Sequence, residues 1–323
     1  MMDWTDRHCR FFHRLITQRT RLYTEMVTTG ALLHGDVPRH LDFDAAEHPL
    51  ALQLGGSELQ DLAACAKLAV RWGYDEINLN CGCPSERVQR GAFGACLMSE
   101  AALVRDCVAA MRDAAALPVT VKHRIGVDRQ ERYEFVRDFI GTVAEGGCEV
   151  FIVHARNAWL KGLSPKQNRE VPPLRHDIVH RLKREFTDLT IVTNGGITGN
   201  DQVAEQLESV DGVMLGREAY HHPALMADWD VRFLGAAGQA CAADDAWRLA
   251  VEQRMVGYMH GLRDVVPWAH IARHMLGLWA GRPGARRWRQ VWSDHRLKSQ
   301  PASEVFRLAR AAREAMDTAS VSA

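Results

Sequence analysis

The feature that most constrains the fold is a regular alternation of short β-rich runs with helical stretches over the first two thirds of the chain. Several of these runs are apolar throughout, which is typical of strands that are covered on both faces. Strand, helix and strand in this rhythm predict βαβ units and a parallel sheet. We expect seven strands, at residues 21–26, 50–56, 76–80, 119–125, 149–156, 189–196 and 212–217.

A closed (β/α) barrel has eight strands, one more than these runs supply. The opening residues MMDWTDRH resemble the loop that follows a strand, so the missing strand would be the first. We therefore expect an α/β fold, a (β/α)8 TIM barrel whose first strand is truncated. The helices that follow Ser57 and Ser99 are expected to use these serines as N-caps.

The character of the chain changes near its last quarter, where every segment has a helical period. The small and polar stretch AAGQACAADDA precedes these segments, as a linker would. We expect a catalytic barrel domain over residues 1–238, an all-helical domain over 239–317 and a disordered tail over 318–323.

Charge and composition exclude several classes of protein. Lysine plus arginine and aspartate plus glutamate both number 40, so the net charge gives no overall sign of nucleic-acid binding. No apolar run reaches the ~18 residues of a membrane span, so we expect a cytoplasmic protein without a membrane partner. The eight cysteines form no CxxC pair and no zinc-like spacing, so we expect neither disulfides nor a metal.

Polar side chains stand where the predicted strands end, and in a barrel the chemistry is built at the carboxyl ends of the strands. Lys122 and Arg124 are two residues apart, so both point to one face of their strand. A lysine and an arginine rarely face a dry core, and the same reasoning applies to His154 at the end of the next strand. Gln53 and Asn80 are amides in apolar runs. The alternatives are a satisfied buried amide for Gln53 and a surface position for Lys122 and His154.

The last two strands carry glycine motifs, TNGGI and LGREA. Barrel enzymes often bind phosphate at these two positions through backbone N–H groups. Gly195, Gly196 and Gly216 let the backbone approach a ligand closely, and Arg217 offers a planar fork to a phosphate. A phosphate here, with a cation and an amide at the barrel mouth, favours FMN as cofactor.

These segments together resemble one family. MMDWTDRHCRFF, PLALQLGG, EINLNCGCPS, VTVKHRIG, VHARNAWLKGLSPKQNREVPPL, TNGGI and LGREAY, in this order, are similar to the tRNA-dihydrouridine synthases, and most of all to the bacterial A-type subfamily. The resemblance extends over nearly the whole chain and into HMLGLWAGRPGARRWRQ of the helical tail.

The resemblance implies an FMN barrel that reduces the C5–C6 double bond of uridines in the tRNA D-loop, with NADPH as the usual reductant. It implies uridine 20 as target, together with its neighbour 20a. By the same resemblance the flavin would be held by Met1, Met2, Gln53, Lys122, His154, Asn194, Gly195, Gly196, Gly216 and Arg217.

The resemblance also implies a role for one of the three neighbouring cysteines Cys81, Cys83 and Cys96. Hydride from the flavin would add to C6 of uracil, and C5 would need a proton from the opposite face. A thiol with a pKa of about 8.5 is protonated at neutral pH and remains a usable acid. Cys83 matches the family's proton donor, whereas Cys81 is not required by the motif and Cys96 is expected to pack.

Substrate contacts follow from the same resemblance. Asn80 would contact a uracil that has left its tertiary stacking, and Arg124 would bind uracil O4 or a nearby phosphate. Lys166 and Arg169, with Arg286 and Arg289 in the tail, are expected to take tRNA phosphates. The tail's tryptophans are expected to pack in the core, and we expect a monomer.

Two alternatives remain at this point. One is an FMN barrel that acts on a small unsaturated substrate, as dihydroorotate dehydrogenases do. The other is a flavin-free tRNA-binding protein that uses the barrel as a scaffold.

Overall fold

The computed structural model describes residues 1–85, 88 and 91–315 and contains two compact units. The first, which we call the sheet unit, comprises Met1–Asp3 and Arg21–Gly216. The second, the helical unit, comprises Trp4–Thr20 and the chain from Arg217 onward. This division falls earlier than the limits of 1–238 and 239–317 expected from the sequence, and the expected tail at 318–323 lies outside the described residues.

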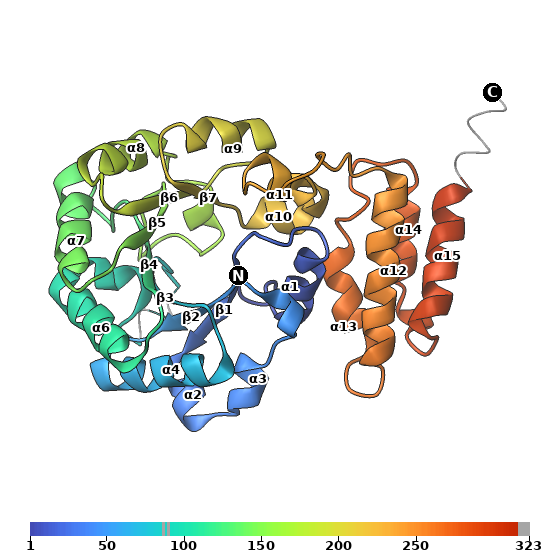
Figure 1. Ribbon diagram of the computed structural model, residues 1–323, viewed down its shortest axis with the longest axis horizontal. Helices are drawn as coiled ribbons and strands as arrows, with labels where there is room; N and C mark the ends of the chain where they lie inside the picture. The colour runs from blue at the N-terminus through green and yellow to red at the C-terminus, as the bar shows by residue number, and fades with distance from the viewer. Residues whose placement is uncertain (86–87, 89–90, 316–323) are drawn as a thin grey trace. The chain divides into compact units, whose positions relative to one another are not determined.

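The sheet unit is built on seven parallel strands that pair in sequence order (Figure 1). All seven strands predicted from the sequence are confirmed. They are β1 (Leu22–Thr28), β2 (Leu50–Gly55), β3 (Glu76–Cys81), β4 (Val119–Arg124), β5 (Val150–His154), β6 (Thr190–Asn194) and β7 (Gly212–Met214).

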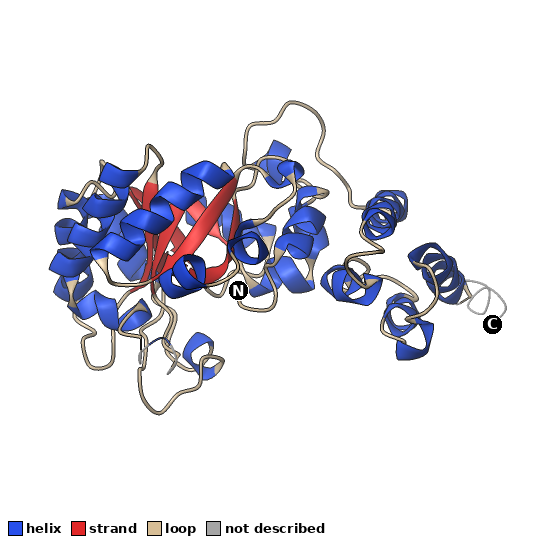
Figure 2. Ribbon diagram, turned by 90° about the horizontal axis from the view of Figure 1, so that it is seen from below, coloured by secondary structure: helices blue, strands red, loops and turns tan. Residues whose placement is uncertain are grey.

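Helices of the sheet unit lie in an arc around the strands (Figure 1). Figure 2 shows the strands in red and the helices in blue from a second direction. They are α2 (Thr29–His34), α3 (Val37–Leu41), α4 (Leu59–Trp72), α6 (Ala101–Ala114), α7 (Tyr133–Glu145), α8 (His176–Glu185) and α9 (Asn200–Leu207). Three short 3-10 helices accompany them: η1 (Ala45–Glu47), η2 (Gly94–Ser99) and η3 (Gln167–Arg169).

The apolar core of this unit lies between the strands and these helices. Ile77 and Leu79 of β3 are fully buried and belong to one cluster with Cys65 of α4 and Val108 of α6. Because successive side chains of a strand point to opposite faces, the residues between them must occupy the other face of the sheet.

The expected serine N-caps are wrong. Helix α4 is capped by Glu58 and helix α6 by Glu100, in both cases without a side-chain hydrogen bond. Ser99 ends the 3-10 helix η2 instead, and the carbonyl of Ser57 accepts a bond from the Cys107 thiol at 3.4 Å.

The described residues of the helical unit form helices and loops, without a strand. They are α1 (Arg7–Arg14), α10 (Arg217–His221), α11 (Trp229–Arg232), α12 (Asp245–Gly261), α13 (Trp268–Ala272), α14 (Ala285–Trp292) and α15 (Ala302–Glu314), with the 3-10 helices η4 (Pro223–Met226), η5 (Arg273–Met275) and η6 (His295–Leu297). Among the described residues, no helix has both the length and the hydropathy that a membrane span requires.

Tryptophans form the core of the helical unit, as the sequence predicted. Trp268, Trp279, Trp288 and Trp292 are at most 8% exposed. The buried carboxylate of Glu252 accepts the indole N–H of Trp279 at 3.1 Å, of Trp288 at 2.7 Å and of Trp292 at 2.9 Å. These rings therefore pack around one acceptor and are not available for stacking on bases.

Candidate functional site

The inner face of the sheet is polar where β3 crosses it. Glu76, Asn78 and Asn80 alternate with the buried Ile77 and Leu79, so all three polar residues face away from the helices. A barrel interior is normally filled by branched apolar side chains. Glu76 lies at the amino end of β3, and Asn80 near the carboxyl end indicates a site there.

Asn80 holds the loop that follows β3. Its Oδ1 accepts the backbone N–H groups of Gly82 and Cys83, both at 3.0 Å. Its Nδ2 donates to Oε1 of Gln53 on β2 at 2.9 Å. Gln53 is thus a hydrogen-bonded amide, and its contact with a flavin stays a prediction.

Cys83 lies in this loop and, like Cys96, is half-buried, whereas Cys81 is buried. The Sγ of Cys83 lies 3.6 Å from Ser85 Oγ, and its carbonyl accepts from Ala95 N at 2.9 Å. Cys81 is fully buried and burial raises its pKa well above the ordinary value. Burial also raises the pKa of Cys96, whose thiol donates to the Phe93 carbonyl at 3.0 Å.

Lys122 brings a positive charge to the inner face of the sheet. Its Nζ donates to Asn194 Oδ1 at 3.0 Å, and Asn194 Nδ2 donates to the Met214 carbonyl at 2.8 Å. Burial, followed by the nearby Arg124 guanidinium, lowers the pKa of Lys122 to about 7. Lys122 forms no ion pair with any described residue, and its side chain bonds to an amide oxygen instead of a carboxylate.

Arg124 connects the loop after β3 with the segment between β5 and α8. It is buried, and its Nε donates to the Gly82 carbonyl at 2.9 Å. Its Nη1 donates to the carbonyls of Asn157 at 3.1 Å and Asn168 at 3.0 Å. Burial lowers the pKa of Arg124 to about 10. Its Nη2 donates to none of the described residues, and only this group remains for a substrate.

The loop after β6 has little room for side chains. Gly195 and Gly196 have φ values of +111° and +73°, a region that glycine adopts readily. A Cβ on Gly195 would lie 2.5 Å from His154 Cδ2, and the Gly195 carbonyl accepts from His176 Nε2 at 2.8 Å. Burial, with the surrounding arginines and Lys122, lowers the pKa of His154 well below its ordinary value, so the ring is neutral.

The loop after β7 approaches the start of the chain. A Cβ on Gly216 would lie 3.3 Å from the Met1 sulfur, so Met1 and Gly216 are neighbours, whereas Met2 is 57% exposed. Arg217 is the first residue of α10 and belongs to the helical unit, and its contact with a phosphate stays a prediction.

The basic residues expected to contact tRNA are exposed in both units. Lys166 caps η3 and Arg169 ends it, in the loop after β5. Arg286 and Arg289 lie on the outer face of α14, while the neighbouring Trp288 and Trp292 point into the core. Side chains three apart share a helical face, so the two arginines can engage one phosphate backbone.

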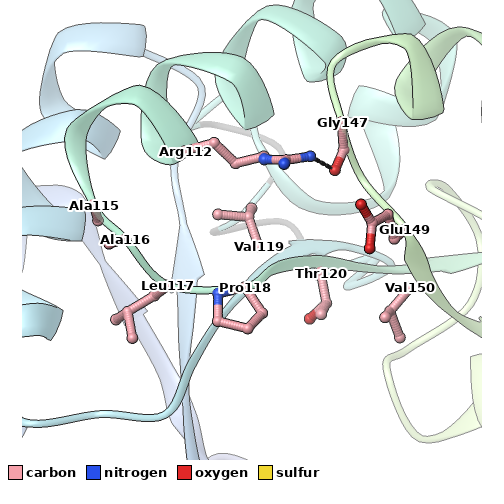
Figure 3. A pocket seen from close by; sticks show the side chains of 10 residues that line it. All are labelled: Arg112, Ala115, Ala116, Leu117, Pro118, Val119, Thr120, Gly147, Glu149 and Val150. Carbon is pink, nitrogen blue, oxygen red and sulfur yellow. Dashed lines mark hydrogen bonds between the residues drawn. The ribbon is translucent and has the colours of Figure 1, made fainter.

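Cavities between described residues of the sheet unit lie at both ends of its strands. One, of about 370 Å³, is at the amino ends of β4 and β5, where Arg112 donates to the Gly147 carbonyl (Figure 3). The other, of about 730 Å³, is lined by loops after β3, β4 and β5, including Cys96, Asp128 and Trp159. The first lies at the end of the strands opposite to Cys83 and Asn80, so it is not part of the candidate site.

Sequence reasoning missed three residues beneath the site. Asn78, Thr120 and Glu76 are buried and bonded to one another, but none was singled out. The run EINLN does indicate a polar face, because its polar residues recur at every second position of a strand.

Comparisons with known proteins identify the family of this chain. The family model described as "Dihydrouridine synthase (Dus)" matches residues 1–316. A relative from Pseudomonas putida called tRNA-dihydrouridine(20/20a) synthase is 55% identical over 311 residues, which cover 95% of this chain and 90% of the relative. A protein of the same name from Vibrio vulnificus is 52% identical and covers 96% of this chain and 94% of its own length.

A solved structure was also matched. Morphinone reductase superposes with a TM-score of 0.49 at 13% identity, covering 76% of this chain and 85% of that one, which adds nothing to the family assignment. The family model and the relatives span nearly all of the residues that build the site. This chain belongs to the dihydrouridine synthase family.

Proposed function

We propose that this protein is a tRNA-dihydrouridine synthase that reduces the C5–C6 double bond of uridines 20 and 20a in the tRNA D-loop. The relatives from Pseudomonas putida and Vibrio vulnificus carry this activity and these positions in their names. The observation that carries the proposal is the convergence of a thiol, an amide and a lysine at the carboxyl ends of β3 and β4, where this lysine forms no ion pair with any described residue.

The residues at the barrel mouth fit FMN. Lys122 has no carboxylate partner among the described residues, which suits the negative charge of a reduced flavin. Gly195 and Gly196 leave no room for a Cβ, as a backbone that approaches a phosphate requires. With FMN bound and reduced by NADPH, the cofactor would supply the hydride to C6 of the uracil.

The flavin contacts of the remaining residues are part of the same proposal. Gln53 and Lys122 would meet the polar edge of the ring system, with Asn194 holding the lysine in place. Met1, Met2, His154, Gly216 and Arg217 would complete the cofactor site.

Cys83 is the proposed proton donor to C5. It lies in a loop that Asn80 and Arg124 hold from two sides, since both bind groups at Gly82 and Cys83. A fixed thiol within reach of the substrate can act as a general acid, and the proton then leaves sulfur for carbon. Asn80 would contact the uracil, and Arg124 would use its remaining Nη2 group.

The substrate tRNA would be bound by exposed basic residues of both units. Lys166 and Arg169 would act beside the site, and Arg286 and Arg289 would act from α14. Such contacts fix the position of a nucleic acid without selecting its sequence. We further propose that the enzyme acts as a monomer in the cytoplasm.

The test is dihydrouridine formation by the purified protein. The full chain, loaded with FMN and supplied with NADPH, is incubated with tRNA that lacks dihydrouridine, and the product is mapped by position. Dihydrouridine at positions 20 and 20a is the expected result. Its formation at other positions only would overturn the site assignment, and no formation with flavin bound and reduced would overturn the function.

A further inference from the structure

Beneath the candidate site, five buried side chains form a continuous hydrogen-bonded chain, which we call the amide relay. Its members are Glu76, Thr120, Asn78, Gln53 and Asn80. Each is at most 9% exposed except Asn80, which is half-buried. Strand register explains the alignment, because Gln53 pairs with Asn78 and Asn78 pairs with Thr120 on adjacent parallel strands.

The upper end of the relay fixes the direction of the hydrogen bonds. The backbone N–H groups of Gly82 and Cys83 can only donate, so the Asn80 atom that faces them must be the oxygen. The Asn80 nitrogen therefore donates to Gln53 Oε1 at 2.9 Å. Gln53 Nε2 must then donate in turn, to Asn78 Oδ1 at 2.8 Å.

The lower end of the relay imposes the same direction. Glu76 is paired with Arg21, whose side chain is 41% exposed, and its Oε1 lies 2.7 Å from Thr120 Oγ1. A carboxylate only accepts, so the Thr120 hydroxyl donates to it and accepts from Asn78 Nδ2 at 2.8 Å. The carbonyl of Ile77 is a longer alternative at 3.5 Å.

Both ends of the relay impose the same direction on its hydrogen bonds. None of its three amides can therefore turn over without breaking a buried hydrogen bond. Both lone pairs of Asn80 Oδ1 are then in use, and Asn80 offers a ligand one N–H and no acceptor. Gln53 offers one N–H and one lone pair. The inner end of the barrel thus supports the same amide orientation at the barrel mouth that the backbone N–H groups of Gly82 and Cys83 require.

We propose that Glu76, Thr120 and Asn78 are positioning residues that fix the amide of Asn80 as a donor and so hold the Cys83 loop in place. On the proposed function, the Asn80 N–H faces a pyrimidine carbonyl oxygen and not the N3–H group. The holding of the loop is a property of the chain itself and does not depend on that function.

The test removes one link of the relay and keeps its shape. Thr120→Val replaces the hydroxyl by a methyl group, and Thr120→Ser restores the hydroxyl. The matched control is Thr193→Val on β6, since Thr193 is also fully buried and its Oγ1 has no hydrogen-bond partner among the described residues. Amide hydrogen exchange at Gly82 and Cys83 is measured in the ligand-free proteins.

We expect Thr120→Val to speed exchange at these two amides at least fivefold, while Thr120→Ser and Thr193→Val stay within twofold of the wild type. Unchanged exchange in Thr120→Val would overturn the proposal, and so would an equal increase in Thr193→Val. If Thr120→Val does not fold, Thr120→Cys takes its place with the same criteria, because a thiol is a weak donor.

A second readout connects the relay to the reaction. With FMN and tRNA, Thr120→Val should lower kcat about tenfold and change KM for tRNA less than twofold, and Thr120→Ser should restore kcat. A kcat within twofold of wild type in Thr120→Val would overturn the positioning role. A wild-type protein that forms no dihydrouridine would refute the proposed function alone, because the exchange experiment would still decide whether the relay holds the loop.

Discussion

Lys122 Nζ donates to Asn194 Oδ1 at 3.0 Å although β5 lies between the two strands that carry these residues. The hydrogen bond therefore spans the inner face of the sheet and does not follow its edge. Asn194 is held in turn by the Met214 carbonyl of β7 at 2.8 Å. One lysine thus links β4, β6 and β7, and its charge is placed where the barrel opens.

Replacing this lysine should change how stability depends on pH. Burial lowers the pKa of Lys122 from 10.5 to about 7, so between these values the unfolded chain binds more protons than the folded one. The free energy of unfolding of the ligand-free wild type should then rise with pH in this window, by up to about 1.4 kcal/mol per pH unit. Lys122→Met should lose this rise, as measured by urea unfolding at pH 7 and pH 9.

The control for this experiment is Lys67→Met, which removes an exposed lysine of α4. It should keep the pH dependence of the wild type. If Lys122→Met and the wild type gain equal stability between pH 7 and pH 9, the lysine is not buried with a depressed pKa.

The glycine loop after β6 offers a test of the cofactor site. Gly195→Ala places a Cβ 2.5 Å from His154 Cδ2 in a backbone region with φ of +111°. We expect a loss of stability on the order of 1–3 kcal/mol and a dissociation constant for FMN at least tenfold higher. The measurements are urea unfolding and FMN titration of the ligand-free protein.

Gly199→Ala is the matched control, because a Cβ on Gly199 has nothing within 4 Å. FMN binding by this variant should equal that of the wild type. Equal FMN affinities for Gly195→Ala and Gly199→Ala would place the phosphate elsewhere.

Much of the fold was predictable because apolar runs alternate with amphipathic helices. The spacing of Lys122 and Arg124 predicted that both share one face of their strand, and their side chains bond to Asn194 of β6 and to the loop after β3. The link from Asn78 to Thr120 was not predictable, since it depends on the register between β3 and β4. The start of α6 was also misplaced, because Ser99 ends the 3-10 helix η2. A helical period in the sequence alone cannot separate η2 from α6.

Cys83→Ala should separate the two halves of the reaction. We expect the variant to bind FMN and to accept electrons from NADPH at the normal rate, because the thiol holds neither the glycine loop nor Lys122. Dihydrouridine formation should fall by about 10²–10⁴-fold, since the uracil loses its proton donor. Single-turnover assays with pre-reduced enzyme and tRNA measure this step.

Cys96→Ala is the control for the thiol, because Cys96 donates to the Phe93 carbonyl in the same region. It should retain near-normal turnover. Normal dihydrouridine formation by Cys83→Ala would assign the proton to another group.

Removing Arg286 and Arg289 together should weaken tRNA binding and reduce its dependence on salt. Each arginine that contacts a phosphate releases about one counterion, so the slope of log K against log salt should become shallower by about 2. Binding is measured by filter retention or anisotropy over a range of salt concentrations. The control is Arg307→Ala, which removes an exposed arginine paired with Glu304 on α15 and should change the slope little. An unchanged slope in the double variant would mean that the tRNA contact lies elsewhere.

The core of the helical unit depends on an acceptor and not only on apolar packing. Glu252 is 1% exposed, and its two oxygens accept three indole N–H groups. Glu252→Gln keeps the shape but turns an N–H group toward an indole N–H, so a buried donor loses its partner. We expect the unit to be destabilised by about 1–3 kcal/mol, measured by urea unfolding followed by tryptophan fluorescence. The control is Glu304→Gln on α15, since the side chain of Glu304 is 37% exposed and pairs with Arg307. It should have little effect, and an equally small effect of Glu252→Gln would show that packing alone holds the tryptophans.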